Sequence, residues 1–449
     1  MGLLPEKALT RSVLKIATPA VAGLSSQMVV SVTETAMVGR LEDTKVVLAA
    51  MALASLSAWA LTSAFSSLAT GTHVLVARRT GERDFPGAGE VLNNSLLLSF
   101  ILGLLISVPG YIFSHDFINF FAADPDVATA GAGYMEWRFI GIGIFLFVVS
   151  YRGFFNGIGH TKVFMYSAIV INFSNIFFNY ILIFGNFGAP RMGLPGAGLA
   201  VALSNVLGLI YFVAATFAPG YRKTYKYYSK LRIRGDLFRQ IVKISLPVSF
   251  QNILILLGFL VFAAIAGYVG TTEQAATQVV ISALFLSFLP CFGFGTGAQT
   301  LVGQSMGKGQ LDLARRYGLE ASRLATYYTI ALGCVFIMFP GAVISVITND
   351  PDVAAVARPL IQIAGAAQMF YAPGIVLAHA LQAAGATMFV MWVEVLTHWV
   401  IFLPTCYALG VLLGYGIVGA WLALPAYIIV YSLWIYLKYR RGTWLHIKV

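Results

Sequence analysis

The sequence predicts an all-α polytopic membrane protein whose twelve transmembrane helices form two six-helix bundles. Three observations predict this fold class: an apolar composition, continuous apolar segments of membrane-spanning length, and an internal duplication. Hydrophobic residues make up 59% of the 449 residues and charged residues only 10%, whereas soluble domains carry roughly 25% charged residues. A soluble enzyme or binding protein is therefore excluded.

Apolar segments follow one another along almost the whole chain. A transmembrane helix needs about 20 predominantly apolar residues, and twelve segments satisfy this requirement. They are residues 13–38, 46–76, 92–113, 127–157, 163–185, 194–217, 241–268, 274–304, 320–346, 354–384, 388–411 and 416–437. Because these segments use most of the chain, we expect no extramembrane nucleotide-hydrolysing domain, and no phosphate-binding G-x-x-x-x-G-K-[ST] loop occurs.

Positive charge indicates how these helices are oriented. With both termini on the cytoplasmic side, most of the 29 lysine and arginine residues fall in the termini, the inner loops and the long loop at 219–240. Since positive charge stays inside during insertion, the sequence predicts a multi-pass protein of the cell (inner) membrane with cytoplasmic termini. The net charge of +11 then reflects topology and contact with anionic membrane lipid, so no nucleic-acid partner is expected.

The two halves of the chain resemble each other at a nearly constant spacing. The charged pentapeptide at 124–128 (DPDVA) recurs at 350–354, and the Thr-Gly pair at 70–71 recurs at 296–297. Each copy holds six helices, so both copies insert with the same orientation and are expected to be related by a pseudo-two-fold axis along the membrane normal. We predict an N-lobe at 1–218, a basic cytoplasmic linker at 219–240 and a C-lobe at 241–449.

Two such lobes favour a secondary transporter that works by alternating access around a central cavity. A channel needs a filter loop or a symmetric pore, and no filter-like sequence occurs. The three cysteines lie inside apolar segments and match no zinc or redox spacing. We therefore expect a protein that is not an enzyme, needs no cofactor or structural metal, and works as a monomer.

Glu34 is the only carboxylate deep within the apolar segments of the first lobe. Burial penalises the ionised form of a carboxyl group, and an ionisable residue inside a membrane is a candidate functional site by default. Glu34 is therefore the predicted coupling group. The alternative is an interfacial glutamate near a helix end.

Asn172, Asn175 and Asn179 are spaced so that they project from one face of the fifth helix. Their amides can bind a cation or hydrogen-bond a carboxylic acid. They can equally serve as contacts between helices, worth roughly 0.6–2 kcal/mol each.

Other polar residues inside the apolar segments are secondary candidates. His379 and Glu394 are candidates to line the cavity, although a purely structural role is open for each. Pro19 and Pro247 occupy equivalent positions in the two copies, and proline removes a helical hydrogen bond. Pro19 is thus a predicted bending point of the first helix, with a static kink as the alternative.

Several stretches, taken in order, resemble the multidrug and toxic compound extrusion (MATE) family over nearly the whole chain. They are residues 34–39 (ETAMVG), the turn containing 151–161, and residues 296–307 with the following Ala-Arg-Arg at 314–316. The resemblance implies two helix bundles that export organic, often cationic compounds against protons or sodium. Residues 134–138 (YMEWR) are similar to the branch named for DNA-damage inducibility.

The resemblance also assigns site residues, with departures from the family pattern. The family's carboxylate in the first helix is Glu34 here, and its paired positions in the fifth helix match Asn175 and Asn179. A threonine of the sixth helix is replaced by Val201. In the C-lobe the two cation-site carboxylates are replaced by Ile255 and Tyr371, so the resemblance implies coupling in the N-lobe unless Glu394 substitutes. Asn172 and Tyr371 join the candidates for lining the cavity.

The sequence therefore predicts a secondary active exporter with Glu34, Asn175 and Asn179 as the coupling group. We favour protons over sodium, because three groups supply few oxygen ligands; if sodium is the coupling ion, it is expected at these same residues. The first alternative is a flippase for lipid-linked precursors from the same superfamily, and the second is a receptor or channel. The identity of the small organic substrates is open at this point.

Overall fold

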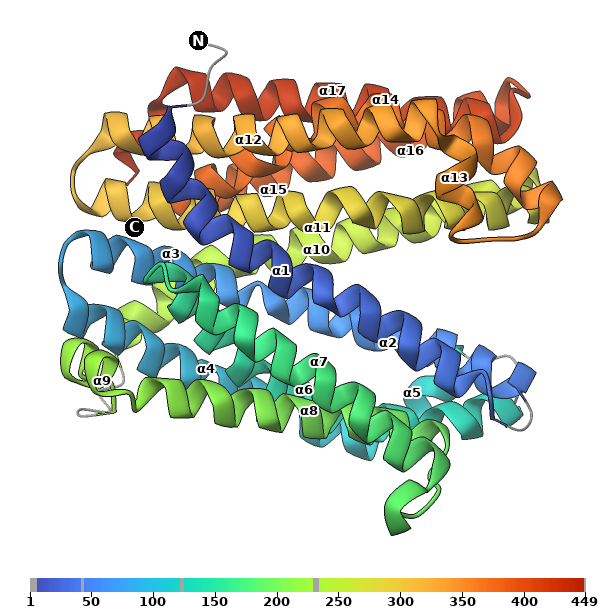
Figure 1. Cartoon of the computed structure of the whole chain (residues 1–449), viewed down its shortest axis with the longest axis horizontal. Coiled ribbons are helices and arrows are strands. Elements are labelled where there is room, and N and C mark those ends of the chain that lie inside the picture. The colour runs from blue at the N-terminus through green and yellow to red at the C-terminus, as the bar shows by residue number, and fades with distance from the viewer. Residues whose placement is uncertain (1–5, 42–43, 122–124, 229–233, 448–449) are drawn as a thin grey trace. The chain divides into compact units, whose positions relative to one another are not determined.

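The computed structural model describes residues 6–41, 44–121, 125–228 and 234–447. Within these ranges every regular element is helical (Figure 1). Twelve spans are long and apolar enough to cross a membrane, so the predicted fold class is confirmed.

The spans agree with the predicted segments and differ mainly at their ends. The first six are α1 (Lys7–Val38), α2 (Thr44–Ser66) continued by α3 (Leu68–Gly81), α4 (Phe85–Ile112), α6 (Pro125–Gly157), α7 (Thr161–Phe184) and α8 (Leu194–Thr216). Five of the last six are α10 (Gly235–Val269), α11 (Thr271–Gly307), α12 (Leu311–Met338), α14 (Pro351–Ala383) and α17 (Gly416–Arg441). The span before α17 is built from four consecutive helical segments, namely α15 (Thr387–Leu396), η2 (Thr397–Phe402), α16 (Leu403–Tyr407) and η3 (Ala408–Leu412). Short helices that the sequence did not predict are α5 (Ser114–Phe121), η1 (Asn186–Gly188), α9 (Pro219–Tyr225), α13 (Pro340–Ser345) and η4 (Thr443–His446).

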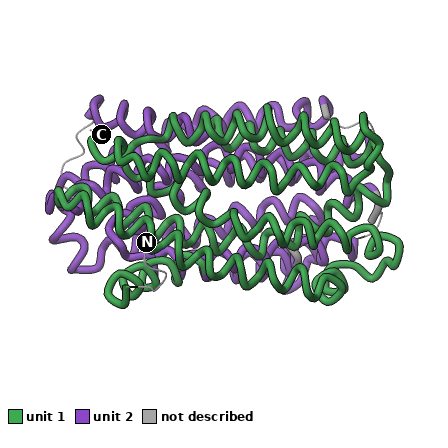
Figure 2. Tube along the Cα trace, turned by 90° about the horizontal axis from the view of Figure 1, so that it is seen from above, with its two compact units in different colours: residues 1–21, 250–449 green, residues 22–249 purple. Residues whose placement is uncertain are grey.

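Packing divides the chain into two compact units (Figure 2). The first unit comprises the described part of residues 1–21 and 250–449, and the second comprises the described part of 22–249. Both boundaries fall inside a helix, just beyond Pro19 in α1 and just beyond Pro247 in α10. The lobes at 1–218 and 241–449 therefore stay a prediction about the duplication, because packing assigns the first halves of α1 and α10 differently.

In the unit 22–249, α6 is the central helix and packs against α2, α3, α4 and α8. Small residues let its backbone approach its neighbours closely. A Cβ atom added at Gly153 would lie 2.6 Å from the backbone oxygen of Ala69 and 2.9 Å from the Cβ of Thr72. The glycine therefore sets the distance between α6 and α3.

Gly153→Ala should destabilise the protein although alanine is the better helix former. The new methyl group has no room against the α3 backbone, and overpacking of this kind costs about 1–3 kcal/mol. The measurement is the thermal unfolding midpoint in detergent, with Gly220→Ala as the control because a Cβ there meets nothing within 4 Å. An unchanged or raised midpoint for Gly153→Ala would contradict the close packing of α3 on α6.

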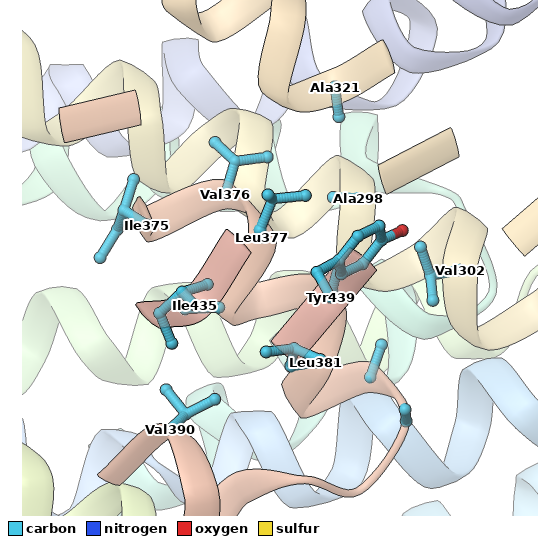
Figure 3. Close-up of a cluster of buried hydrophobic side chains, with 14 of the residues drawn as sticks. Ala298, Val302, Ala321, Ile375, Val376, Leu377, Leu381, Val390, Ile435 and Tyr439 are labelled. Carbon is cyan, nitrogen blue, oxygen red and sulfur yellow. The ribbon is translucent and has the colours of Figure 1, made fainter. Parts of the chain in front are cut away.

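In the other unit, α14 has the corresponding central position and packs against α11, α12 and α17. Figure 3 shows part of its core, where Leu377 and Leu381 of α14 meet Val302, Ile435 and Tyr439. The second copy of the repeated pentapeptide opens α14, and its Asp350 accepts hydrogen bonds from two backbone amides at 2.9 and 3.1 Å. The first copy opens α6 in the same way, since that helix begins at Pro125; Asp124, the equivalent of Asp350, lies outside the described residues.

The linker begins as α9 and is attached to the unit 22–249. The Tyr227 hydroxyl donates to the Thr216 carbonyl oxygen at 2.5 Å. Burial raises the pKa of Tyr225 to about 12, so its hydroxyl stays neutral and does not offset the positive charge of the linker. Arg222 and Lys223 are exposed, as a contact with anionic headgroups requires.

Candidate functional site

Glu34 lies on α1, one turn before that helix ends at Val38. The run from Pro19 to Val38 contains no second proline, so the helix continues, and it ends where Gly39 follows. The side chain is half-buried, and its Oε1 is buried with no hydrogen-bond partner in the described part of the chain. Because an unpaired buried oxygen is costly, Glu34 is positioned to accept a proton or a cation.

The groups that act on Glu34 come from α6. The Tyr134 hydroxyl lies close enough to interact with the Glu34 carboxyl group, and the Arg138 guanidinium interacts with the same carboxyl group through its charge. Tyr134 and Arg138 are one helical turn apart and share a face, with the Arg138 Cζ 5.8 Å from the centre of the Tyr134 ring. Ser55 of α2 adds a hydroxyl 3.3 Å from the Tyr134 hydroxyl.

Arg138 is an unexpected member of this cluster. The sequence places it near the outer end of a helix, where a long cationic side chain reaches water. In the structure its Nε is buried without a hydrogen-bond partner among the described residues. Glu34 and Arg138 therefore form a site with one negative and one positive group.

The three asparagines of α7 face a different set of partners. The Asn179 amide donates to Asn175 Oδ1 at 2.8 Å, and the Asn175 amide approaches the Ser204 hydroxyl at 3.5 Å. Asn172 donates to Ser26 of α1 at 2.5 Å. Asn179 Oδ1 is buried without a partner in the ranges described. These hydrogen bonds support the α7–α8 and α1–α7 contacts, while Glu34 is engaged by Tyr134 instead.

Sequence reasoning missed Ser204 and Tyr134. Ser204 lies on α8 one turn beyond Val201, and its hydroxyl also donates to the Ala200 carbonyl oxygen at 2.8 Å. A hydroxyl is thus present near the position where Val201 lacks one. In the sequence, Tyr134 and Arg138 could have been linked by their spacing of four residues, which places them on one helical face. Their helix is the most buried span of this unit.

The candidates of the second copy lie in the other unit. His379 of α14 bonds the Ile375 carbonyl oxygen through Nδ1 at 2.8 Å and packs on Phe292, which supports a structural role. Tyr371 packs on Phe288 with ring centres 4.9 Å apart. Glu394 of α15 is buried and accepts a hydrogen bond from the Tyr427 hydroxyl.

The chemistry available at Glu34 is proton or ion exchange at a carboxyl group. Across the described ranges, no group of three or more His, Cys, Asp or Glu side chains is arranged to hold a metal ion. Within the described residues, twelve helices long and apolar enough to cross a membrane, with a carboxyl group and a guanidinium that interact inside one unit, define a multi-pass membrane protein of the transporter class.

The MatE family model matches this chain over residues 19–181 and again over 247–408. The chain therefore belongs to the MATE family of multidrug efflux transporters. The two matches begin at the equivalent Pro19 and Pro247, in agreement with the duplication seen in the sequence.

Curated relatives cover nearly the full length of the chain. It is 25% identical to the probable multidrug resistance protein NorM of Thermotoga maritima, over 97% of this chain and 93% of the relative. It is 27% identical to the uncharacterized transporter YisQ of Bacillus subtilis, over 85% of this chain and 84% of the relative. Assignment to the DNA-damage-inducible branch stays a prediction.

Solved structures share the fold at lower identity. An outward-facing multidrug resistance MATE transporter of the MOP superfamily matches with a TM-score of 0.91 at 19% identity, over 97% of this chain and 96% of that one. A MOP superfamily transporter from Pyrococcus furiosus, described as having a binding pocket of reverse polarity, matches with a TM-score of 0.89 at 20% identity over the same shares.

Proposed function

We propose that this MATE transporter exports small organic, often cationic compounds in exchange for protons, with Glu34 as the proton-carrying group. It works as a monomer in the inner membrane, with both termini and the basic linker on the cytoplasmic side. The linker contacts anionic lipid through its exposed cations. The relatives named for multidrug resistance support this substrate class.

The position of Arg138 beside Glu34 is the observation that carries the choice of proton over sodium. A hard cation needs a shell of oxygen ligands, and the groups that act on Glu34 are one hydroxyl and a guanidinium that repels other cations. The amide nitrogens of Asn175 and Asn179 donate to Ser204 and Asn175, so only Asn179 Oδ1 is left as an open amide oxygen, too few for such a shell. A proton needs only the vacant Oε1.

Proton binding changes the charge of this site from neutral to positive. When Glu34 takes a proton from water, an O–H bond forms and the Arg138 guanidinium loses its counter-charge. A cationic substrate is then repelled, and loss of the proton to the other side removes this repulsion. We assign to Pro19 the bend that lets α1 respond to this change, and to the α7 asparagines the support of α1 and α8.

The flippase alternative requires cations that bind a diphosphate. Arg138 is such a cation, but Glu34 balances its charge, so the site offers no excess of positive groups while Glu34 is ionised. Export of organic compounds is therefore the better match to this geometry.

The test is the dissociation of a fluorescent organic cation from detergent-purified protein. We expect acid in sodium-free buffer to displace the dye saturably, and sodium at constant near-neutral pH to have little effect. Potassium at the same ionic strength controls for screening. Saturable displacement by sodium but not potassium would overturn the proton assignment. Direct binding of a lipid-linked diphosphate to protein that does not bind the dye would favour the flippase.

A further inference from the structure

A second carboxyl group lies deeper in the protein than Glu34, in the other compact unit. Glu394 is on α15 with only 3% of its surface exposed. Its helix runs directly into η2, a π-helical turn over Thr397–Phe402. Such turns are rare and frequently mark functional sites.

Among the described residues, the polar groups that act on the Glu394 carboxyl group are tyrosine hydroxyls. From α17, Tyr427 donates a hydrogen bond to Oε1, and the Tyr431 hydroxyl lies close enough to interact but outside hydrogen-bond geometry. From α14, Tyr371 interacts with Glu394 through its hydroxyl. Among the described residues, no lysine or arginine acts on Glu394, which distinguishes it from Glu34.

His398 follows Glu394 by one helical turn and adds a vacant polar group. It is 2% exposed, and neither ring nitrogen has a hydrogen-bond partner in the described part of the chain. Its ring packs on Tyr427 and Phe402 at 5.4 and 5.1 Å. From α10, Gly258 makes room for it, since a Cβ there would lie 2.2 Å from Nε2.

Within the described residues, the Glu394 carboxyl group therefore has no counter-ion. His398, whose ring nitrogens can accept a proton, lies one helical turn away. An isolated buried carboxylate costs far more than a neutral acid, so such a group binds a proton instead. In the described part of the chain Glu394 forms no ion pair. Hydroxyl and imidazole groups can exchange a proton, whereas a hard metal cation needs a shell of oxygen ligands. We propose that Glu394, held by Tyr427 and adjacent to His398, is a second proton-binding site of the transporter.

The transport consequence rests on the proton antiport proposed above. If Glu34 and Glu394 each release one proton when substrate binds, two protons are exchanged for one substrate. For a monovalent cation the cycle then moves net charge. With Glu34 alone the same exchange would be electroneutral.

The site itself is tested by infrared difference spectroscopy of the purified full-length protein between acid and alkaline buffer. Glu34 and Glu394 should each give a carboxylic-acid carbonyl band, of which Glu394→Gln removes one and Glu34→Gln removes the other. Tyr427→Phe should shift the Glu394 band, because Oε1 loses its hydrogen bond. Tyr371→Phe is the matched control and should retain the band in place, since its hydroxyl makes no hydrogen bond to Glu394.

Retention of every carboxylic-acid band in Glu394→Gln overturns this proposal. So does loss of the band assigned to Glu394 in Glu320→Gln, which changes a buried carboxylate paired with Arg323 at 3.0 Å. If Glu394→Gln does not fold, the Tyr427→Phe shift decides the assignment.

Proton release on addition of a monovalent cationic dye, followed with an indicator in weak buffer, tests the coupling. We expect two protons per dye in wild type and one in either Glu→Gln variant. Sodium release instead of proton release overturns both proposals. Release that depends on Glu34 but not on Glu394 overturns only the second.

Discussion

Glu34→Gln is expected to insert and fold normally yet lose export driven by a proton gradient. Glutamine keeps the size and hydrogen-bonding capacity of the side chain but cannot titrate. The amide group fills the same space beside Tyr134 of α6, so the local packing should be retained. We expect transport into acid-loaded vesicles to fall to the background of empty vesicles, a loss of tenfold or more.

Glu136→Gln is the control for this measurement, because Glu136 lies on α6 between Tyr134 and Arg138 but is not among the groups that act on Glu34. Its export should remain at the wild-type rate. Substrate binding by Glu34→Gln at equilibrium separates coupling from binding: we expect the dye to bind with a weaker response to acid than in wild type, because only Glu394 still exchanges a proton. Gradient-driven export at the wild-type rate in Glu34→Gln would exclude Glu34 as the coupling group.

Arg138→Gln is expected to have the second largest effect. It removes the cation that acts on Glu34. The half-buried carboxyl group then has only the Tyr134 hydroxyl as a polar neighbour on α6. Because an opposite charge stabilises the ionised form of a carboxyl group, its removal should make Glu34 retain its proton at a less acidic pH. Dye release should then occur closer to neutral pH, and export at neutral pH should fall several-fold.

The pH profile of dye release distinguishes this role from a structural one. Misfolding would lower binding at every pH, whereas loss of the counter-charge shifts the profile and leaves the maximal binding intact. Arg358→Gln, which changes an exposed arginine of α14, should leave the profile unchanged. If the pH midpoint of dye release is the same in Arg138→Gln as in wild type, the guanidinium does not change the proton affinity of Glu34.

The sequence by itself determined the fold class, the helix number and the family. These follow from properties that are local or periodic along the chain: a lipid solvent demands about 20 apolar residues per span, and a duplication leaves matching motifs at constant spacing. The prominence of Glu34 and Glu394 was also evident, because a carboxylate within an apolar segment is rare and costly.

The tertiary structure decided which groups meet these carboxyls. Tyr134 and Arg138 of α6 act on Glu34, although the spacing of Asn175 and Asn179 on one face of α7 made those amides the expected partners. Spacing along one helix specifies which side chains share a face, but not which neighbouring helix that face touches. That choice depends on close contacts made by small residues, such as Gly153 against α3, which are distributed over helices far apart in the chain. The counter-charge of Glu34 and its absence at Glu394 are consequently products of helix packing.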